Sequence, residues 1–274
     1  MTIKNILLAH TGSAGFPHSL RHAVKVAKRH EAWLTGIYGG PSSYFDQVLG
    51  LTEDLHDKLK TVRAAKIEGS RELFQQEVEA AGIENRARFL MPEVIGKLSL
   101  AEIARNFDFI VTGYPPKLPT DEYRAVSPDV MALQSGRPVL VVPDDYISEG
   151  LANHVLVAWD GKRASARALS DAMTVLEDAP KKVSILTVGD VLHEMPTGTD
   201  IVTHLERHGI QAEHILRPRS GRKIAEIIET TASEIGAQLI VMGAYEHSKF
   251  SQDLFGGVTH HVIRTAKVPV FMSH

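Results

Sequence analysis

A pair of adjacent glycines, Gly256 and Gly257, is the part of this sequence best suited to hold an anion. A helix is expected to begin just after them, at Val258 and Thr259. The N–H groups in the first turn of a helix point outward and its dipole favours negative charge, while glycine has no Cβ to block close approach. The sequence therefore predicts a phosphate-binding turn here.

Two further segments of the second half carry groups that suit a nucleotide. Trp159 and Asp160 follow an apolar run that ends at Ala158, and Gly243 closes another apolar run. Asp160 can accept a hydrogen bond from a ribose hydroxyl or an exocyclic amine, and Trp159 is either a core or lid aromatic or a surface on which a base stacks. His247, in the loop after Gly243, is a further candidate contact. These residues together fit a mononucleotide that lies across several strand ends.

The candidate residues belong to the second copy of an internal repeat. Four small or apolar positions recur with a displacement of 149 (158 − 9): Ala9, Gly12, Leu20 and Ala23 match Ala158, Gly161, Leu169 and Ala172. Each copy must be a complete folding unit, so we expect one domain over residues 1–146 and a second over residues 152–274. The stretch between them is polar and contains glycine, as suits a domain boundary.

Short apolar runs alternate with amphipathic stretches through both copies. Strands are expected at 6–9, 33–38, 86–90, 109–112 and 138–142, and again at 155–158, 183–188, 212–216, 239–242 and 269–272. Helices are expected at 18–30, 52–81, 97–106 and 128–134, and again at 163–177, 198–208, 222–235 and 256–266. This alternation indicates parallel sheets covered by helices on both faces. The predicted fold class is α/β, with two tandem doubly wound sheets of five mainly parallel strands and ligands beyond the carboxyl ends of the strands.

On these residues the chain resembles a tandem universal stress protein over nearly its whole length. Members of that family carry Gly-x-x-Gly, nine residues, then Gly-Ser/Thr after the fourth strand, and an Asp after the first. The resemblance implies Rossmann-like halves that pair through their fifth strands, here as an internal pseudo-dimer joined at 139–142 and 268–272. By position, it assigns nucleoside contacts to Asp160 and Val188, and phosphate contacts to Gly243, Gly256, Val258 and Thr259.

The second copy departs from the family pattern at two places. Glu246 stands where the second glycine is expected, and Gly257 replaces the Ser or Thr. Like charges about 4 Å apart cost roughly 1 kcal/mol in water and about 4 kcal/mol in a partly buried setting, against about 8 kcal/mol for a micromolar complex. Glu246 therefore opposes tight ATP binding unless Lys249, Arg222 or Arg264 offsets its charge or the carboxylate turns outward.

The first copy lacks the same features. Thr11 occupies the position of the Asp, and Gly113 is followed by Tyr-Pro-Pro-Lys-Leu-Pro. Proline has no N–H to donate and stiffens the loop, so we expect no ATP in this copy and leave open a more apolar ligand. His10-Thr11-Gly12-Ser13 faintly resembles the His-x-Gly-His of nucleotidyltransferases, but the second His is missing, which disfavours adenylyl transfer.

The composition excludes several classes of function. A net charge of −3 offers no general attraction to nucleic acid or anionic membranes. There is no Cys, which removes disulfides and thiolate metal sites and suits a reducing cytosol. No apolar run approaches the roughly 18 residues needed to span a bilayer, and the first residues lack a signal-peptide pattern. We therefore expect a soluble, cytoplasmic protein.

The expected function is a stress-response sensor or regulator whose second domain binds ATP or AMP weakly, with Mg²⁺ only alongside ATP. No catalytic group is identified, so the protein is expected not to be an enzyme, and any ATP hydrolysis would be slow and incidental. The alternative is a nucleotide-independent interaction module with vestigial pockets, in which the long charged helix or a sheet face recruits a protein partner. Whether the chain forms a homodimer is left open.

Overall fold

The computed structural model describes residues 3–39, 52–91, 98–114, 127–147, 152–178, 182–189, 195–245 and 257–274. The strands are β1 (Asn5–His10), β2 (Trp33–Tyr38), β3 (Ala87–Leu90), β4 (Phe109–Gly113), β5 (Val139–Val142), β6 (His154–Ala158), β7 (Lys182–Val188), β8 (Ala212–Arg217), β9 (Leu239–Gly243) and β10 (Val270–Ser273). The helices are α1 (Phe16–His30), α3 (Glu53–Ala81), α5 (Leu100–Ala104), α7 (Pro128–Ser135), α8 (Arg163–Asp178), α9 (Ile201–Arg207), α10 (Ile224–Glu234) and α11 (Val258–Thr265), with a 3₁₀ turn, η1, at Glu84–Arg86.

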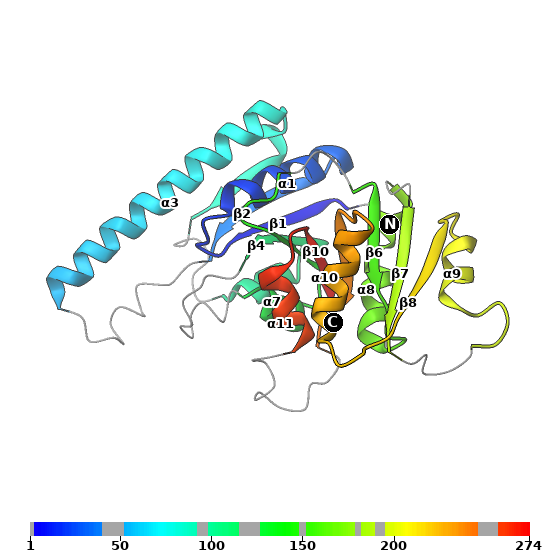
Figure 1. The fold of residues 1–274 in the computed structure, drawn as a ribbon. Helices are drawn as coiled ribbons and strands as arrows, with labels where there is room; N and C mark the ends of the chain where they lie inside the picture. Colours follow the sequence, from blue (N-terminus) through cyan, green and yellow to red (C-terminus); the bar gives the residue numbers. More distant parts are fainter. Residues whose placement is uncertain are drawn as a thin grey trace.

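The ten strands form one sheet in the order β3-β2-β1-β4-β5-β10-β9-β6-β7-β8 (Figure 1). All neighbouring strands run parallel except β5 and β10, which are antiparallel. Each half is therefore doubly wound, as the strand–helix alternation predicts. In each half the chain changes direction across the sheet between its first and fourth strands, β1 and β4 or β6 and β9.

The two halves join where β5 meets β10, the pairing expected for an internal pseudo-dimer. Val141 lies opposite Val270 and Leu140 lies opposite Phe271 in this antiparallel ladder. Phe271 also stacks on Phe109 of the other half, with ring centroids 5.7 Å apart. The β5–β10 pairing, called the seam below, is thus held by backbone hydrogen bonds and by buried apolar side chains.

Helices cover both faces of the sheet, and side chains alternate between the faces along each strand. On β1, Ile6 and Leu8 belong to one core, beneath α1, α3, α8 and α9. Leu7 and Ala9 belong to the other core, beneath α5, α7, α10 and α11. Both cores contain residues of both halves, so each is continuous across the seam.

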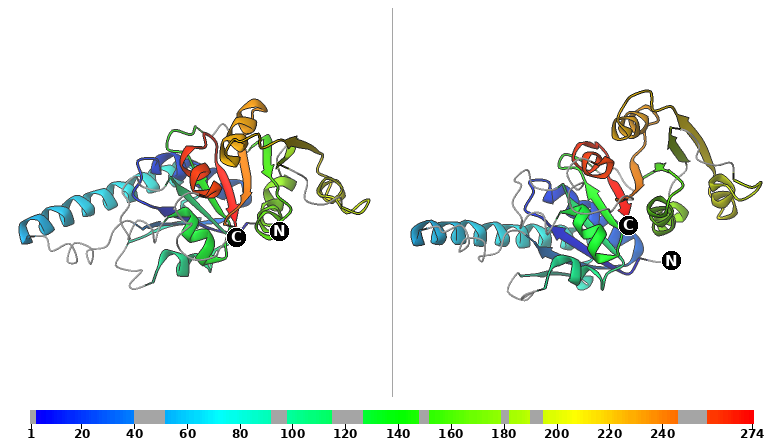
Figure 2. Two further views of the ribbon diagram at one scale, coloured as in Figure 1. Left: turned by 60° about the horizontal axis from the view of Figure 1, so that its bottom comes forward. Right: turned by 90° about the horizontal axis from the view of Figure 1, so that it is seen from below.

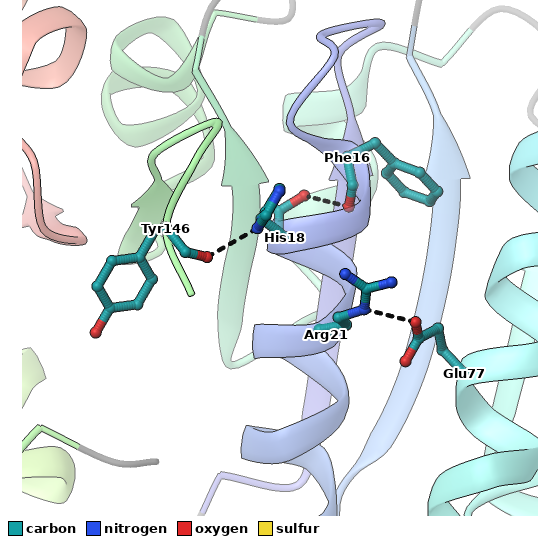
Figure 3. A network of polar contacts seen from close by, with 6 residues as sticks. Phe16, His18, Arg21, Glu77 and Tyr146 are labelled. Carbon is teal, nitrogen blue, oxygen red and sulfur yellow. Dashed lines mark hydrogen bonds and ion pairs between the residues drawn. The ribbon is translucent and has the colours of Figure 1, made fainter. Parts of the chain in front are cut away.

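Helix α1 is tied to elements on both of its sides (Figure 3). His18 Nδ1 lies 2.9 Å from the carbonyl oxygen of Tyr146, in the segment that leaves β5. Arg21 Nε donates to a carboxylate oxygen of Glu77 on α3 at 2.7 Å. The first contact fixes the start of α1 beside the end of the first half, and the second holds α3 against α1.

The second helix of each half differs most between the copies. Helix α3 has 29 residues and projects beyond the sheet, whereas its counterpart α9 has 7 (Figure 2). The helix expected over 97–106 is described only as α5, which has 5 residues and begins with a capping box between Ser99 and Glu102. The remaining predicted helices match the observed ones to within a few residues at either end.

Two histidines of the first half have surroundings that disfavour the charged imidazolium: His10 is buried and His22 is half-buried. Burial, together with the nearby Lys25, lowers the pKa of His22 to about 4. Burial and the nearby Lys66 lower the pKa of His10 to about 3. Among the described residues, His22 Nδ1 has no hydrogen-bond partner. Both side chains are therefore neutral in the folded protein at neutral pH.

These two histidines predict a loss of stability in mild acid. An unfolded histidine has a pKa near 6.5 and takes up a proton between pH 7 and pH 5, while the folded side chains stay neutral. The stability they contribute is present above about pH 6.5 and is lost as the pH falls toward the folded values. We expect the free energy of unfolding to fall by roughly 2 kcal/mol per histidine from pH 7 to pH 5, as measured by urea unfolding.

Single variants separate this effect from general acid destabilisation. His22→Phe should reduce the loss between pH 7 and pH 5 by roughly 2 kcal/mol, whereas His204→Phe, on an exposed part of α9, serves as the control and should not reduce it in this way. An unchanged slope in His22→Phe would contradict the assignment.

Candidate functional site

The ends of three adjacent parallel strands bring the predicted residues of the second half to one edge of the sheet. Strands β9, β6 and β7 are neighbours, and they end at Gly243, Ala158 and Val188. Trp159 follows Ala158, and its N–H donates to the Leu186 carbonyl at 2.8 Å, which extends the β6–β7 ladder by one step. This edge includes the switch point between β6 and β9, the place where open α/β sheets bind ligands.

Asp160 is held in position by the start of α8. Its Oδ1 accepts from the Lys162 backbone N–H at 3.0 Å and from the Ser165 hydroxyl at 2.7 Å. Asp160 itself is exposed, while Ser165 is buried. The carboxylate therefore has one oxygen engaged by two donors at the start of α8, and it keeps a fixed orientation at the edge of the sheet.

Gly243 has a steric role at this edge. A Cβ at this position would lie 2.6 Å from the Ala164 carbonyl carbon and from the Ser165 nitrogen. These are backbone atoms in the first turn of α8, which cannot move aside cheaply. The end of β9 therefore passes close to α8, and only glycine permits that approach.

Helix α11 begins at the same edge, and its N-cap is Gly257. Among the described residues, no side chain caps the helix there, and a Cβ at Gly257 would have none of their atoms within 4 Å. Val258 is half-buried, while Thr259 is buried and its hydroxyl oxygen accepts from the Tyr245 N–H at 3.4 Å. The described start of α11 thus presents a glycine with open space around it.

Four residues named from the sequence lie outside the described residues. They are His247 and Gly256, both predicted ligand contacts, Glu246, the residue predicted to oppose phosphate, and Lys249, one of the residues that could offset its charge. The effect of Glu246 therefore stays a prediction.

The corresponding edge of the first half is filled by its own side chains. His10, the counterpart of Trp159 (159 − 149), is buried and stacks on Phe16 with ring centroids 3.9 Å apart. Tyr38 packs edge-on against the same imidazole at 5.0 Å. The Lys66 ammonium donates to the Gly12 carbonyl oxygen at 2.7 Å. A nucleoside cannot occupy the space that these rings take up.

The two edges differ in the exposure of the residues at three matched positions. Thr11 is buried whereas Asp160 is exposed, Ala9 is buried whereas Ala158 is half-buried, and His10 is buried whereas Trp159 is half-buried. The second half thus keeps an accessible edge where the first half has closed its own.

Sequence reasoning missed two residues of the second-half edge. Ser165 orients Asp160, and its position in the first turn of α8 was a usable signal. Tyr245 follows β9, adopts the left-handed region with φ of 50°, and donates its hydroxyl to an Asp129 carboxylate oxygen at 2.5 Å. Asp129 lies 116 residues earlier in the sequence, so no local pattern predicts this contact.

The described residues also bear on metals and membranes. Within these ranges, no group of three or more His, Asp or Glu side chains is placed to hold a metal ion. None of the described helices is both long and apolar enough to cross a bilayer.

The fold and the edge described above define a tandem, doubly wound α/β protein with Rossmann-like halves. The second half of the chain, residues 152–274, matches the model of the universal stress protein family. A crystal structure of a universal stress protein from Archaeoglobus fulgidus DSM 4304 matches the fold of the whole chain, with a TM-score of 0.71 and 21% identity over 98% of this chain and 96% of that one.

A functionally unknown protein from Pseudomonas aeruginosa PAO1 has a similar fold. Its TM-score is 0.58, with 16% identity over 99% of this chain and 92% of that one. No curated protein matches the sequence. These similarities show a two-domain fold over the full length, including the first half that the family model does not match.

The two glycines at the edge predict different responses to an added methyl group. Gly243→Ala should lower the free energy of unfolding by about 1–3 kcal/mol, because the Cβ meets the backbone of α8. Gly257→Ala should change it by less than about 1 kcal/mol, because none of the described residues has an atom within 4 Å of the added Cβ. Urea unfolding of both variants measures the difference, and equal losses would refute the assigned roles.

Proposed function

We propose that the chain is a cytoplasmic sensor or regulator whose second half binds an adenine nucleotide, ATP or AMP, at the ends of β6, β7 and β9. On this proposal the nucleoside lies near Asp160 and Val188, and the phosphates lie at the start of α11. Mg²⁺ accompanies ATP alone. Binding changes the choice of a protein partner, and the chain performs no catalysis.

The contrast between the two strand-end edges carries this proposal. The first half has the same order of strands, but His10, Phe16 and Tyr38 fill the space beyond them. The second half keeps Asp160 exposed and oriented by Ser165. A pocket that had lost its use would be expected to fill in the same way, because apolar side chains gain by burial.

The residues at the second-half edge suit binding better than catalysis. Asp160 already accepts two hydrogen bonds through Oδ1, so it is set to hold a hydroxyl rather than to move a proton. The open N-terminus of α11 suits an anion, because N–H groups and the helix dipole both favour negative charge there. These roles need no nucleophile and no general base.

A second candidate function is a nucleotide-independent interaction module, and helix α3 favours it. Leu55, Leu59 and Val62 recur at intervals of four and three residues, which places them on one side of the helix. Their exposed fractions are 43%, 36% and 65%. Exposed apolar side chains aligned in this way suit a protein partner.

Calorimetry with ATP tests the first proposal. We expect one site per chain in the wild-type protein, and Asp160→Ala should abolish measurable binding because the nucleoside loses its oriented acceptor. Gly256→Val should do the same by obstructing the phosphates.

Thr11→Ala is the matched control, because Thr11 occupies the position of Asp160 in the first half; it should leave the affinity unchanged. Heat release equal to a buffer blank for every adenine nucleotide would reject nucleotide binding and favour the interaction module.

A further inference from the structure

One partly buried hydrogen bond joins the two halves beside the candidate nucleotide site. The hydroxyl of Tyr245, from the second half, donates to Oδ2 of Asp129, on α7 of the first half, at 2.5 Å. Asp129 is 5% exposed. Burial, followed by the charge of Asp129, raises the pKa of Tyr245, so the tyrosine keeps the proton that it donates.

Asp129 is itself fixed within the first turn of α7. Its Oδ1 accepts from the Val130 N–H at 3.0 Å and also from the Ser127 hydroxyl. Oδ2 is the oxygen that accepts from Tyr245. The carboxylate therefore presents one oxygen across the seam in a direction set by the first half alone.

The backbone of Tyr245 connects β9 and α11, the two elements that meet at the candidate site. Its N–H donates to Thr259 on α11, and it follows β9 two residues after Gly243. Its φ of 50° lies in the left-handed region, which is unfavourable for a bulky side chain and persists only where the surroundings enforce it. The bond to Asp129 is one such enforcing contact.

Helices α7 and α11 meet at this point as equivalent elements of the two copies. With the displacement of 131 that relates Pro138 to Pro269 (269 − 138), Asp129 corresponds to His260. Burial, followed by the nearby Arg264, lowers the pKa of His260, while the charge of Asp129 acts in the opposite direction. The charge of Asp129, in the first turn of α7, therefore acts across the seam on His260, in the first turn of α11.

We propose that the first half controls the nucleotide affinity of the second half through this contact. Asp129 and Tyr245 are positioning residues: Asp129 holds Tyr245, and Tyr245 sets how the end of β9 and the start of α11 lie relative to each other. Anything that moves α7, such as a partner bound to the first half, would thereby change the site. This inference rests on nucleotide binding by the second half.

A second tyrosine provides a matched control. Tyr114 follows β4 of the first half, and its hydroxyl donates to the Ala266 carbonyl, just beyond the opposite end of α11. Tyr114→Phe and Tyr245→Phe each remove one hydroxyl and one bond across the same seam. Tyr114→Phe frees the segment just beyond the carboxyl end of α11, whereas Tyr245→Phe frees the side chain of the residue whose N–H donates to the amino end of α11.

The experiment measures ATP affinity by calorimetry and backbone amide exchange at residues 258–260 without nucleotide, both on the full chain. Tyr245→Phe and Asp129→Ala should weaken ATP binding roughly tenfold, because a hydrogen bond to a buried charged group is lost, and should speed exchange at 258–260. Asp129→Asn retains an oxygen acceptor and should lie within about threefold of wild type. Tyr114→Phe should change neither the ATP affinity nor the exchange rate at 258–260 by more than about twofold.

The outcomes separate the two proposals. If Tyr245→Phe and Tyr114→Phe change both readings equally, the seam is only structural and the inference is overturned. Unchanged affinity and exchange in Tyr245→Phe overturn it as well. If the wild-type chain takes up no ATP, nucleotide binding fails and control of it fails too, while the exchange data still decide whether Tyr245 positions α11.

Discussion

The antiparallel pairing of β5 with β10 is the constraint on which the rest of the molecule depends. It joins two parallel five-stranded units into one sheet and leaves neither of these strands as an exposed edge, which would invite pairing with other chains. It also aligns the cores on each face, so that residues of both halves share each one. Because the pairing is antiparallel, equivalent elements of the two halves face one another, and α7 therefore meets α11.

The same framework supports two different strand-end edges because the side chains at matched positions have diverged. Phe16 occupies the position of Ser165 and stacks on His10, whereas Ser165 instead orients Asp160. At this matched position, phenylalanine thus helps to fill the edge with aromatic rings, whereas serine holds a carboxylate at the surface. The backbone needs no change, since both positions lie in the first turn of a helix after the first strand of each half.

The elements of the fold could be predicted because their signals are local. Short apolar runs mark most of the strands, and the repeat indicates the same order of strands in both halves. The strand-end residues followed from the same reasoning, since parallel neighbours end at one edge. The filling of the first-half edge could not be predicted in this way, because it depends on the packing of His10, Phe16 and Tyr38, which come from three different elements. The bond from Tyr245 to Asp129 has no local signal either, as it joins residues on opposite sides of the seam.

Duplication within one chain permits an interface that two identical chains could not form. In a symmetric dimer, equivalent positions carry the same residue, so Asp129 would face a second aspartate at the position of His260. Two carboxylates buried close together repel and cannot both stay ionised. In the tandem chain the second copy has His260 there and supplies a tyrosine as donor to the single carboxylate. Because the two halves belong to one chain, the first half can supply Asp129 as a fixed acceptor, and the second half can supply Tyr245, at its strand-end edge, as the donor.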